Sequence, residues 1–154
     1  MNTNHFSNLN GAGLRVAVVA SRFNQAMTDA MLSDCLDALR SAGVRDADVA
    51  AFRVPGSFEL PVVSAALAKK IQYDAIVCLG VIIKGETRHD QFIADAVTNG
   101  LTTIAITHNV PVILGVVTAE NLAQAEARTL GGQKKGWVAG MSAIETALAL
   151  RSAR

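Results

Sequence analysis

Short apolar runs alternate with amphipathic segments along almost the whole chain, and this alternation limits the fold more than any other feature. The runs fall at residues 14–20, 47–54, 73–83, 102–108 and 110–118. They are rich in β-branched residues and lack a regular apolar–polar alternation, so we expect strands that are covered on both faces. Strands that alternate with helices form a parallel sheet with right-handed crossovers. The sequence therefore predicts an α/β fold: a three-layer α/β/α sandwich around a central, mainly parallel sheet of four to five strands with flavodoxin-like winding.

The segments between the runs have the periodicity of helices. The first carries apolar residues from Met27 to Leu39 on one side, and Gly43 is placed to end it. Further helices are expected at 57–70, 89–101, 119–128 and 137–148, and Asn109 is expected in a short link between two strands. A chain of 154 residues has the size of one domain, which we place at residues 14–154 after a flexible, polar arm at 1–13.

Composition and charge exclude several classes of function. The net charge of +1 argues against nucleic-acid binding and against a charged membrane-binding face. No apolar run approaches the roughly 18 residues of a membrane span, and the start of the chain lacks the apolar core of a signal peptide. We expect a cytoplasmic protein, in which Cys35 and Cys78 are small buried apolar residues. Only 18% of residues are charged, against roughly 25% on average, which favours a surface covered by further copies of the chain.

Polar clusters follow three of the predicted strands. They are Ser21-Arg22-Phe23-Asn24, Pro55-Gly56-Ser57-Phe58-Glu59 and Lys84-Gly85-Glu86-Thr87-Arg88-His89. In open α/β sheets, ligands bind beyond the carboxyl ends of the strands. We therefore expect the three clusters to lie along one edge of the sheet and to form a binding site.

Each cluster also has a purely structural interpretation. Phe23 could cover the core, and Asn24 could cap the following helix. Gly56 and Ser57 could form a turn and a helix cap, with Glu59 stabilising the helix N-terminus. The residue types alone leave these alternatives open.

The third cluster has the same two interpretations. Thr87 or Asp90 could cap the next helix, with His89 exposed beside it by chance. Alternatively, the backbone N–H groups of residues 85–87 at a helix N-terminus would form an anion site, and phosphate is the usual ligand of such sites. An adjacent imidazole can transfer protons at neutral pH.

The functional interpretations combine into one kind of chemistry. Phe23 offers a flat face to a heterocycle, and Glu59 can accept hydrogen bonds from hydroxyls. Together with a phosphate site and a proton carrier, these groups describe a condensation on a heterocycle. Metal chemistry has no support, because the three histidines and two cysteines show no ligand spacing. No dinucleotide-binding or P-loop glycine pattern occurs either.

Five blocks of the chain carry a family resemblance. In order they are "RFN", "VPGSFELP", "LGVIIKGETRH", "VPVILGVVTAENLAQAEAR" and "KKGWVAGMSAIE". In order and spacing, from about residue 15 to residue 150, the chain resembles the 6,7-dimethyl-8-ribityllumazine synthase family. The resemblance implies the penultimate step of riboflavin biosynthesis: condensation of 5-amino-6-(D-ribitylamino)uracil with 3,4-dihydroxy-2-butanone 4-phosphate, without metal or organic cofactor.

The resemblance assigns the binding of the pyrimidine substrate by matching positions. Phe23 would stack on the ring, Glu59 would accept hydrogen bonds from the ribityl hydroxyls, and backbone groups at residues 81–83 would face the polar edge of the ring. Leu114 stands where the family often has an aromatic residue from a neighbouring subunit. The substrate-binding residues implied are Phe23, Asn24, Gly56, Ser57, Phe58, Glu59, Val81, Ile82, Ile83 and Leu114.

The resemblance also assigns the phosphate site and the catalytic residue. Gly85, Glu86, Thr87 and Arg128 would bind the phosphate, with Arg128 bidentate. His89 would be the general acid and base, and Lys135 and Arg22 would be accessory residues. The implied mechanism is Schiff-base formation, phosphate elimination, ring closure and dehydration.

The resemblance implies a homo-oligomer whose active sites lie between subunits. The family forms pentamers, and some members assemble these into 60-subunit icosahedral shells. The short link at residues 129–136 resembles that of shell-forming members. Riboflavin synthase is a further partner that the resemblance suggests.

Two rival functions are compatible with the same residues. Lys84 could form an imine with a carbonyl substrate, as in an aldolase. Alternatively, the protein could carry a flavin or lumazine without turnover.

Overall fold

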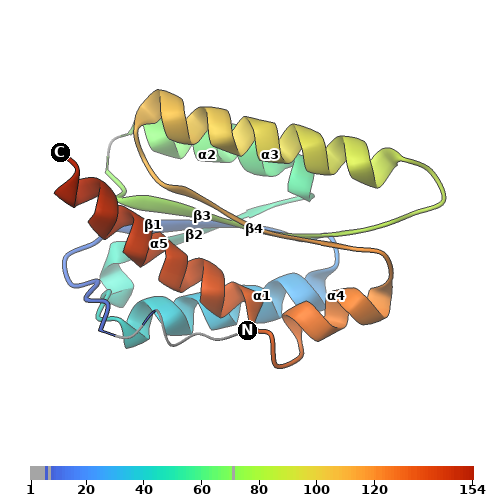
Figure 1. Ribbon diagram of the computed structural model, residues 1–154, viewed down its shortest axis with the longest axis horizontal. Helices are drawn as coiled ribbons and strands as arrows, with labels where there is room; N and C mark the ends of the chain where they lie inside the picture. The colour runs from blue at the N-terminus through green and yellow to red at the C-terminus, as the bar shows by residue number, and fades with distance from the viewer. Residues whose placement is uncertain (1–5, 7, 71) are drawn as a thin grey trace.

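A single four-stranded parallel sheet organises the chain in the computed structural model, which covers residues 6, 8–70 and 72–154. The strand order is β2-β1-β3-β4, which is the order expected of flavodoxin-like winding (Figure 1). The strands are β1 (Val16–Ser21), β2 (Val49–Val54), β3 (Ala75–Ile83) and β4 (Val112–Ala119). The predicted α/β fold is confirmed.

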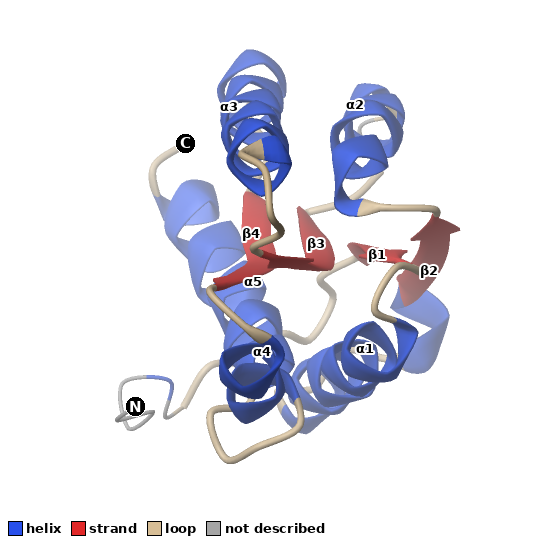
Figure 2. Cartoon of the chain, turned by 90° about the vertical axis from the view of Figure 1, so that its right-hand side faces the viewer, coloured by secondary structure: helices blue, strands red, loops and turns tan. Residues whose placement is uncertain are grey.

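Helices cover both faces of the sheet, which makes three layers. Figure 2 shows α2 and α3 on one face and α1, α4 and α5 on the other. The helices are α1 (Gln25–Ser41), α2 (Leu60–Lys69), α3 (His89–His108), α4 (Leu122–Thr129) and α5 (Lys135–Ser152), and short 3₁₀ turns η2 (Asp46–Asp48) and η3 (Ser57–Glu59) precede β2 and α2. Pro61 lies in the first turn of α2, where the lost N–H has no intrahelical partner.

The two central strands are buried on both faces, as their composition predicts. Val16 and Val18 of β1 belong to the core that packs under α1 and α5, whereas Ala17 and Val19 point into the core under α2 and α3. All four are fully buried. Successive side chains alternate between faces, so a strand without polar positions needs a cover on each side.

The prediction of a strand at residues 102–108 is wrong, because this segment forms the last two turns of α3. The buried side chains of α3 are those of Val97, Leu101 and Ile104, and their i, i+4, i+7 spacing is helical. The hydroxyls of Thr98 and Thr102 donate to the carbonyls four residues earlier, both at 2.8 Å, so β-branched residues are accommodated in the helix.

The ends of two helices explain how the chain leaves the helical layers. Asn109 follows α3 in the left-handed conformation (φ 50°), and links this helix, not a strand, to β4. Gly43 follows α1 at φ +91°, and its N–H donates to the Arg40 carbonyl at 3.0 Å. Gly43 thus ends the first helix as predicted, because glycine adopts this conformation without steric cost.

The arm predicted at residues 1–13 falls partly on positions 1–5 and 7, which lie outside the described residues. Phe6 is buried and belongs to the core under α1 and α5. The Gly11 N–H donates to the Ala42 carbonyl at 2.7 Å, which fixes the chain just before β1. In the described part of the chain, each helix is too short or too polar to cross a membrane.

Candidate active site

The carboxyl ends of the strands bring the three predicted clusters to one edge of the sheet. Ser21 pairs with Val54, so β1 and β2 end at the same level, and β3 runs a little further to Ile83. Figure 2 views the molecule from the side of this edge. The convergence of the clusters follows from the parallel topology and is confirmed.

Two backbone hydrogen bonds hold the start of the loop after β1 to the end of β2. The Arg22 N–H donates to the Val54 carbonyl at 2.8 Å, and the Phe23 N–H donates to the Pro55 carbonyl at 3.0 Å. The ring of Phe23 is 71% exposed, so it does not cover the core. Its flat face is available to a ligand.

Asn24 has a different role from the helix cap that its residue type suggested. It occupies the N-cap position of α1, but its side chain makes no capping hydrogen bond. Instead, Nδ2 donates to the Val81 carbonyl at 3.0 Å, and the backbone is left-handed at φ 60°. Asparagine tolerates this conformation better than most residues. Its amide therefore ties the β1 loop to strand β3.

The turn after β2 places a carboxylate and a hydroxyl at the same edge. Oε2 of Glu59 accepts a hydrogen bond from the Gly56 N–H at 2.9 Å, as expected for a residue that stabilises the start of a helix. Ser57 is buried, and its Oγ lies directly over Gly80 of β3, where an added Cβ would come within 2.4 Å of it. Phe58 is 60% exposed. Gly80 thus makes room for the turn.

The loop after β3 carries the predicted anion site and the histidine. Residues 84–89 are all exposed, and α3 begins at His89. The hydroxyl of Thr87 accepts a hydrogen bond from the His89 N–H at 3.4 Å. Of the two expected caps, Thr87 therefore supplies an acceptor, whereas Asp90 lies in the first turn and does not cap. Val81 and Ile82 are buried just before this loop, and Ile83 is half-buried.

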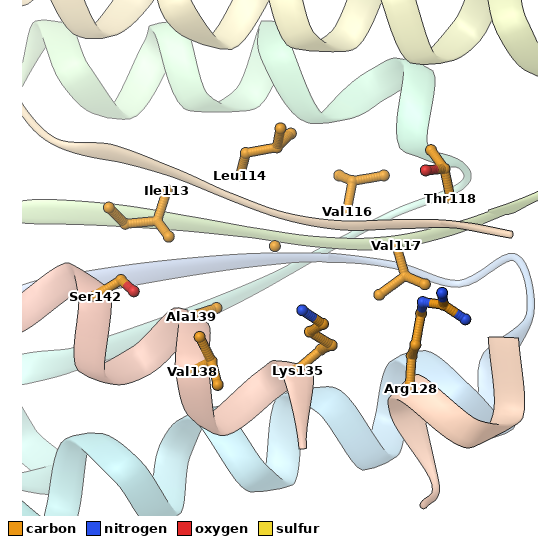
Figure 3. A pocket seen from close by; sticks show the side chains of 11 residues that line it. Ile113, Leu114, Val116, Val117, Thr118, Arg128, Lys135, Val138, Ala139 and Ser142 are labelled. Atoms are coloured by element: carbon orange, nitrogen blue, oxygen red, sulfur yellow. The ribbon is translucent and has the colours of Figure 1, made fainter. Parts of the chain in front are cut away.

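Leu114, Arg128 and Lys135 form a second group, along the open edge of β4. They line a pocket of about 280 Å³ together with residues of β4 and α5. Figure 3 shows the side chains of Arg128 and Lys135 reaching toward β4 from α4 and α5, while Leu114 points to the opposite face of the strand. Leu114 pairs with Cys78, whereas the strand ends at Ala119. It therefore lies about 16 Å along β4 from the carboxyl edge.

The predicted site residues are thus divided between two places in one chain. The first group lies on the loops after β1, β2 and β3, and the second lies on the outer side of the edge strand. Gly136 places the start of α5 in close contact with α1, because an added Cβ would lie 2.1 Å from the Met31 carbonyl oxygen. This contact sets where Lys135 enters the pocket.

Sequence reasoning missed one polar residue at the carboxyl edge, Glu120. It is the first residue after β4, and its Oε2 lies 2.7 Å from Nζ of Lys84. Ligands bind beyond the carboxyl ends of parallel strands, and this rule applies to the fourth strand as well. The position of Glu120 just after the apolar run at 110–118 could therefore have indicated it.

The electrostatics of Lys84 do not support imine chemistry. Its hydrogen bond to Glu120, together with the charges of Glu120 and Asp90, raises the pKa of the Lys84 ammonium. An amine must be neutral to attack a carbonyl, so this pairing opposes a nucleophilic role.

The thiols are unsuited to chemistry as well. Burial raises the pKa of Cys35 and of Cys78 to about 12, so both are neutral at ordinary pH.

Over residues 6, 8–70 and 72–154, no group of three or more His, Cys, Asp or Glu side chains is placed to hold a metal ion.

The fold and the clusters define an α/β protein whose candidate site lies at the carboxyl edge of a parallel sheet. Residues 13–151 match the 6,7-dimethyl-8-ribityllumazine synthase family. The enzyme of that name from Kineococcus radiotolerans is 47% identical over 146 residues, which is 93% of this chain and 89% of the relative. The one from Aquifex aeolicus is 42% identical over 148 residues, 95% of this chain and 96% of the relative. The chain belongs to the 6,7-dimethyl-8-ribityllumazine synthase family of enzymes.

Proposed function

We propose that the protein condenses 5-amino-6-(D-ribitylamino)uracil with 3,4-dihydroxy-2-butanone 4-phosphate to give 6,7-dimethyl-8-ribityllumazine in the cytoplasm. The observation that carries the proposal is the family match over residues 13–151. The carboxyl-edge clusters supply the groups that this reaction needs. These are a flat ring, hydrogen-bond acceptors for hydroxyls, an imidazole, and the loop at residues 85–87, called here the anion loop.

The pyrimidine substrate binds across the first two loops. The exposed ring of Phe23 stacks on the uracil, and Glu59 and the turn before it bind the ribityl chain. The second oxygen of the Glu59 carboxylate has acceptor capacity for the ribityl hydroxyls, since Oε2 takes the Gly56 N–H. The main chain at residues 81–83 lies next to the Phe23 loop because Asn24 bonds to Val81. It faces the polar edge of the ring.

The phosphate of the second substrate binds in the loop at residues 85–87, with Arg128 completing the site. The amine of the uracil attacks the ketone, and water leaves to give the Schiff base. Elimination then breaks the C–O bond to phosphate, and the ribitylamino nitrogen closes the ring with loss of a second water. His89 carries protons in these steps. The nucleophile belongs to the substrate, so most of the acceleration comes from orientation.

The division of the site residues supports an oligomer in which neighbouring chains complete each site. Leu114, Arg128 and Lys135 lie along an open sheet edge, where an adjacent copy can meet them. We propose a homo-oligomer, a pentamer or a 60-subunit icosahedral shell, and favour the shell because of the short link before α5. Riboflavin synthase is a proposed partner. Light scattering of the purified protein distinguishes the assemblies, and a mass near five chains would exclude the shell.

Two experiments test the proposed function. The first mixes both substrates with the protein and follows the absorbance and fluorescence of the lumazine; binding of both without product would indicate a carrier instead. The second mixes His89→Ala chains with Arg128→Met chains. If one site uses His89 of one chain and Arg128 of another, mixed oligomers are more active than either variant alone.

A further inference from the structure

Two contacts join the loop after β3 to the turn after β4. Nζ of Lys84 lies 2.7 Å from Oε2 of Glu120, and the Lys84 N–H donates to the Ala119 carbonyl at 2.9 Å. Lys84 and Glu120 are each the first residue after their strand. The base of the loop that carries residues 85–87 is therefore fixed to the start of the segment leading into α4.

The backbone of Glu120 continues the connection toward Arg128. Its N–H donates to Oε1 of Gln124 at 3.1 Å, and the Gln124 carbonyl accepts from Nη1 of Arg128 at 2.9 Å. Asn121 caps α4 by accepting the Gln124 N–H at 2.9 Å. Figure 3 shows the Arg128 side chain directed from α4 toward the end of β4. One residue thus contacts the anion loop through its side chain and the helix turn of Arg128 through its backbone.

We propose that Glu120 is a positioning residue that holds the base of the anion loop through Lys84 and so sets the affinity for a phosphate monoester. The inference rests on the proposed function for the identity of that ligand. Glu120 contacts Lys84 and not the reacting atoms, so its effect on phosphate is indirect. Under the proposed function, the anion loop and Arg128 of one chain belong to two adjacent sites. The contacts of Glu120 therefore connect one site to the next.

The sign of one substitution separates positioning from simple electrostatics. A carboxylate near an anion site repels the anion, so Glu120→Gln should tighten phosphate binding if charge alone matters. If Glu120 instead holds the loop through Lys84, the same change weakens binding. Loss of an exposed ion pair that holds the loop is expected to raise the phosphate Kd about threefold to fivefold. Both side chains are more than half exposed, which places this pair in that range.

The experiment measures the Kd of inorganic phosphate by calorimetry and the KM of each substrate. Glu120→Gln is expected to raise the phosphate Kd and the KM of the butanone phosphate about threefold to fivefold. The KM of the pyrimidine should change by less than twofold. Glu126→Gln, an exposed carboxylate on α4, is the matched control and should change neither constant. Unchanged or tighter phosphate binding by Glu120→Gln would overturn the proposal, as would wild-type protein that does not bind phosphate.

A second comparison tests whether Glu120 acts through Lys84. In a Lys84→Met background, Glu120→Gln should no longer weaken phosphate binding, because the contact it removes is already absent. Weakening of equal size in both backgrounds would contradict the proposal. The binding data do not require turnover. An inactive wild-type enzyme with the expected phosphate constants would refute the proposed reaction and leave the positioning role standing.

Discussion

Nδ2 of Asn24 donates a hydrogen bond to the main-chain carbonyl of Val81 across 3.0 Å, and so joins two loops that are 57 residues apart in sequence. The contact places the Phe23 loop beside the end of β3, immediately before the anion loop. The residues proposed to stack on the ring and to bind phosphate are thereby held at a fixed separation, which a condensation between two substrates requires.

Substitutions of Asn24 separate the hydrogen bond from the backbone conformation. Asn24→Gly keeps the left-handed backbone at no cost but removes the donor, so the free energy of unfolding should fall by about 1 kcal/mol. Asn24→Ala also forces a Cβ into φ 60°, which adds roughly 1 kcal/mol. Urea unfolding measures both values. Equal stabilities for the two variants would show that the left-handed backbone is not retained.

Gly80→Ala is predicted to destabilise the protein and to weaken binding of the pyrimidine substrate. The new Cβ would lie 2.4 Å from Oγ of Ser57 and 3.4 Å from Cδ1 of Leu60. Relief of this overlap must move the turn after β2, so we expect a loss of about 1–3 kcal/mol in stability. We also expect a higher KM for the pyrimidine substrate. Gly132→Ala is the control, because its Cβ would meet no atom within 4 Å. A Gly80→Ala protein as stable as this control would contradict the packing described for the turn.

His89→Ala is expected to slow turnover without abolishing it. Proton transfer by one positioned imidazole contributes typically about 10²- to 10⁴-fold, whereas orientation of the two substrates is retained. Steady-state lumazine formation measures the loss. His108→Ala, at the other end of α3, removes an imidazole far along the same helix and should leave kcat unchanged. Complete loss of activity in His89→Ala, with both substrates still bound, would show that the histidine does more than carry protons.

The buried thiols predict a loss of stability at alkaline pH. The pKa of Cys35 is about 12 in the folded protein against an ordinary value of 9.0. Between these values the unfolded chain releases a proton that the folded chain keeps. The free energy of unfolding therefore falls as pH rises, by up to about 1.4 kcal/mol per pH unit for one thiol, and is unaffected below pH 9.

The check on this prediction compares urea unfolding of the wild type and Cys35→Ala at several pH values above 9. The variant lacks one titrating thiol, so its stability should fall less steeply with pH. Parallel curves for the two proteins would mean that Cys35 does not titrate on unfolding.

Much of the fold and of the carboxyl-edge site could be predicted because local pattern and topology agree there. The run at 73–83 is apolar at every position that β3 buries, and it is rich in β-branched residues, which favours a strand. Once parallel strands are expected, the residues after them must share an edge, which located Phe23, Glu59 and His89 correctly.

The segment at 102–108 shows where local pattern is insufficient. Its threonines and isoleucines favour a strand by propensity, but the helix begun at His89 continues through them because Leu101 and Ile104 pack on the sheet. Helix propensities of ordinary residues differ by at most about 0.7 kcal/mol, whereas full burial of one such apolar side chain contributes about 1.5–3 kcal/mol.

The sequence by itself determined the layers, the strand ends and the residue types of the site, since these depend on periodicity and on parallel topology. Only the tertiary structure decided how the site residues are grouped. Leu114, Arg128 and Lys135 lie along an open strand edge, and Glu120 meets Lys84, because register and helix packing place them there. Such contacts join residues that are distant along the chain, so no local pattern encodes them.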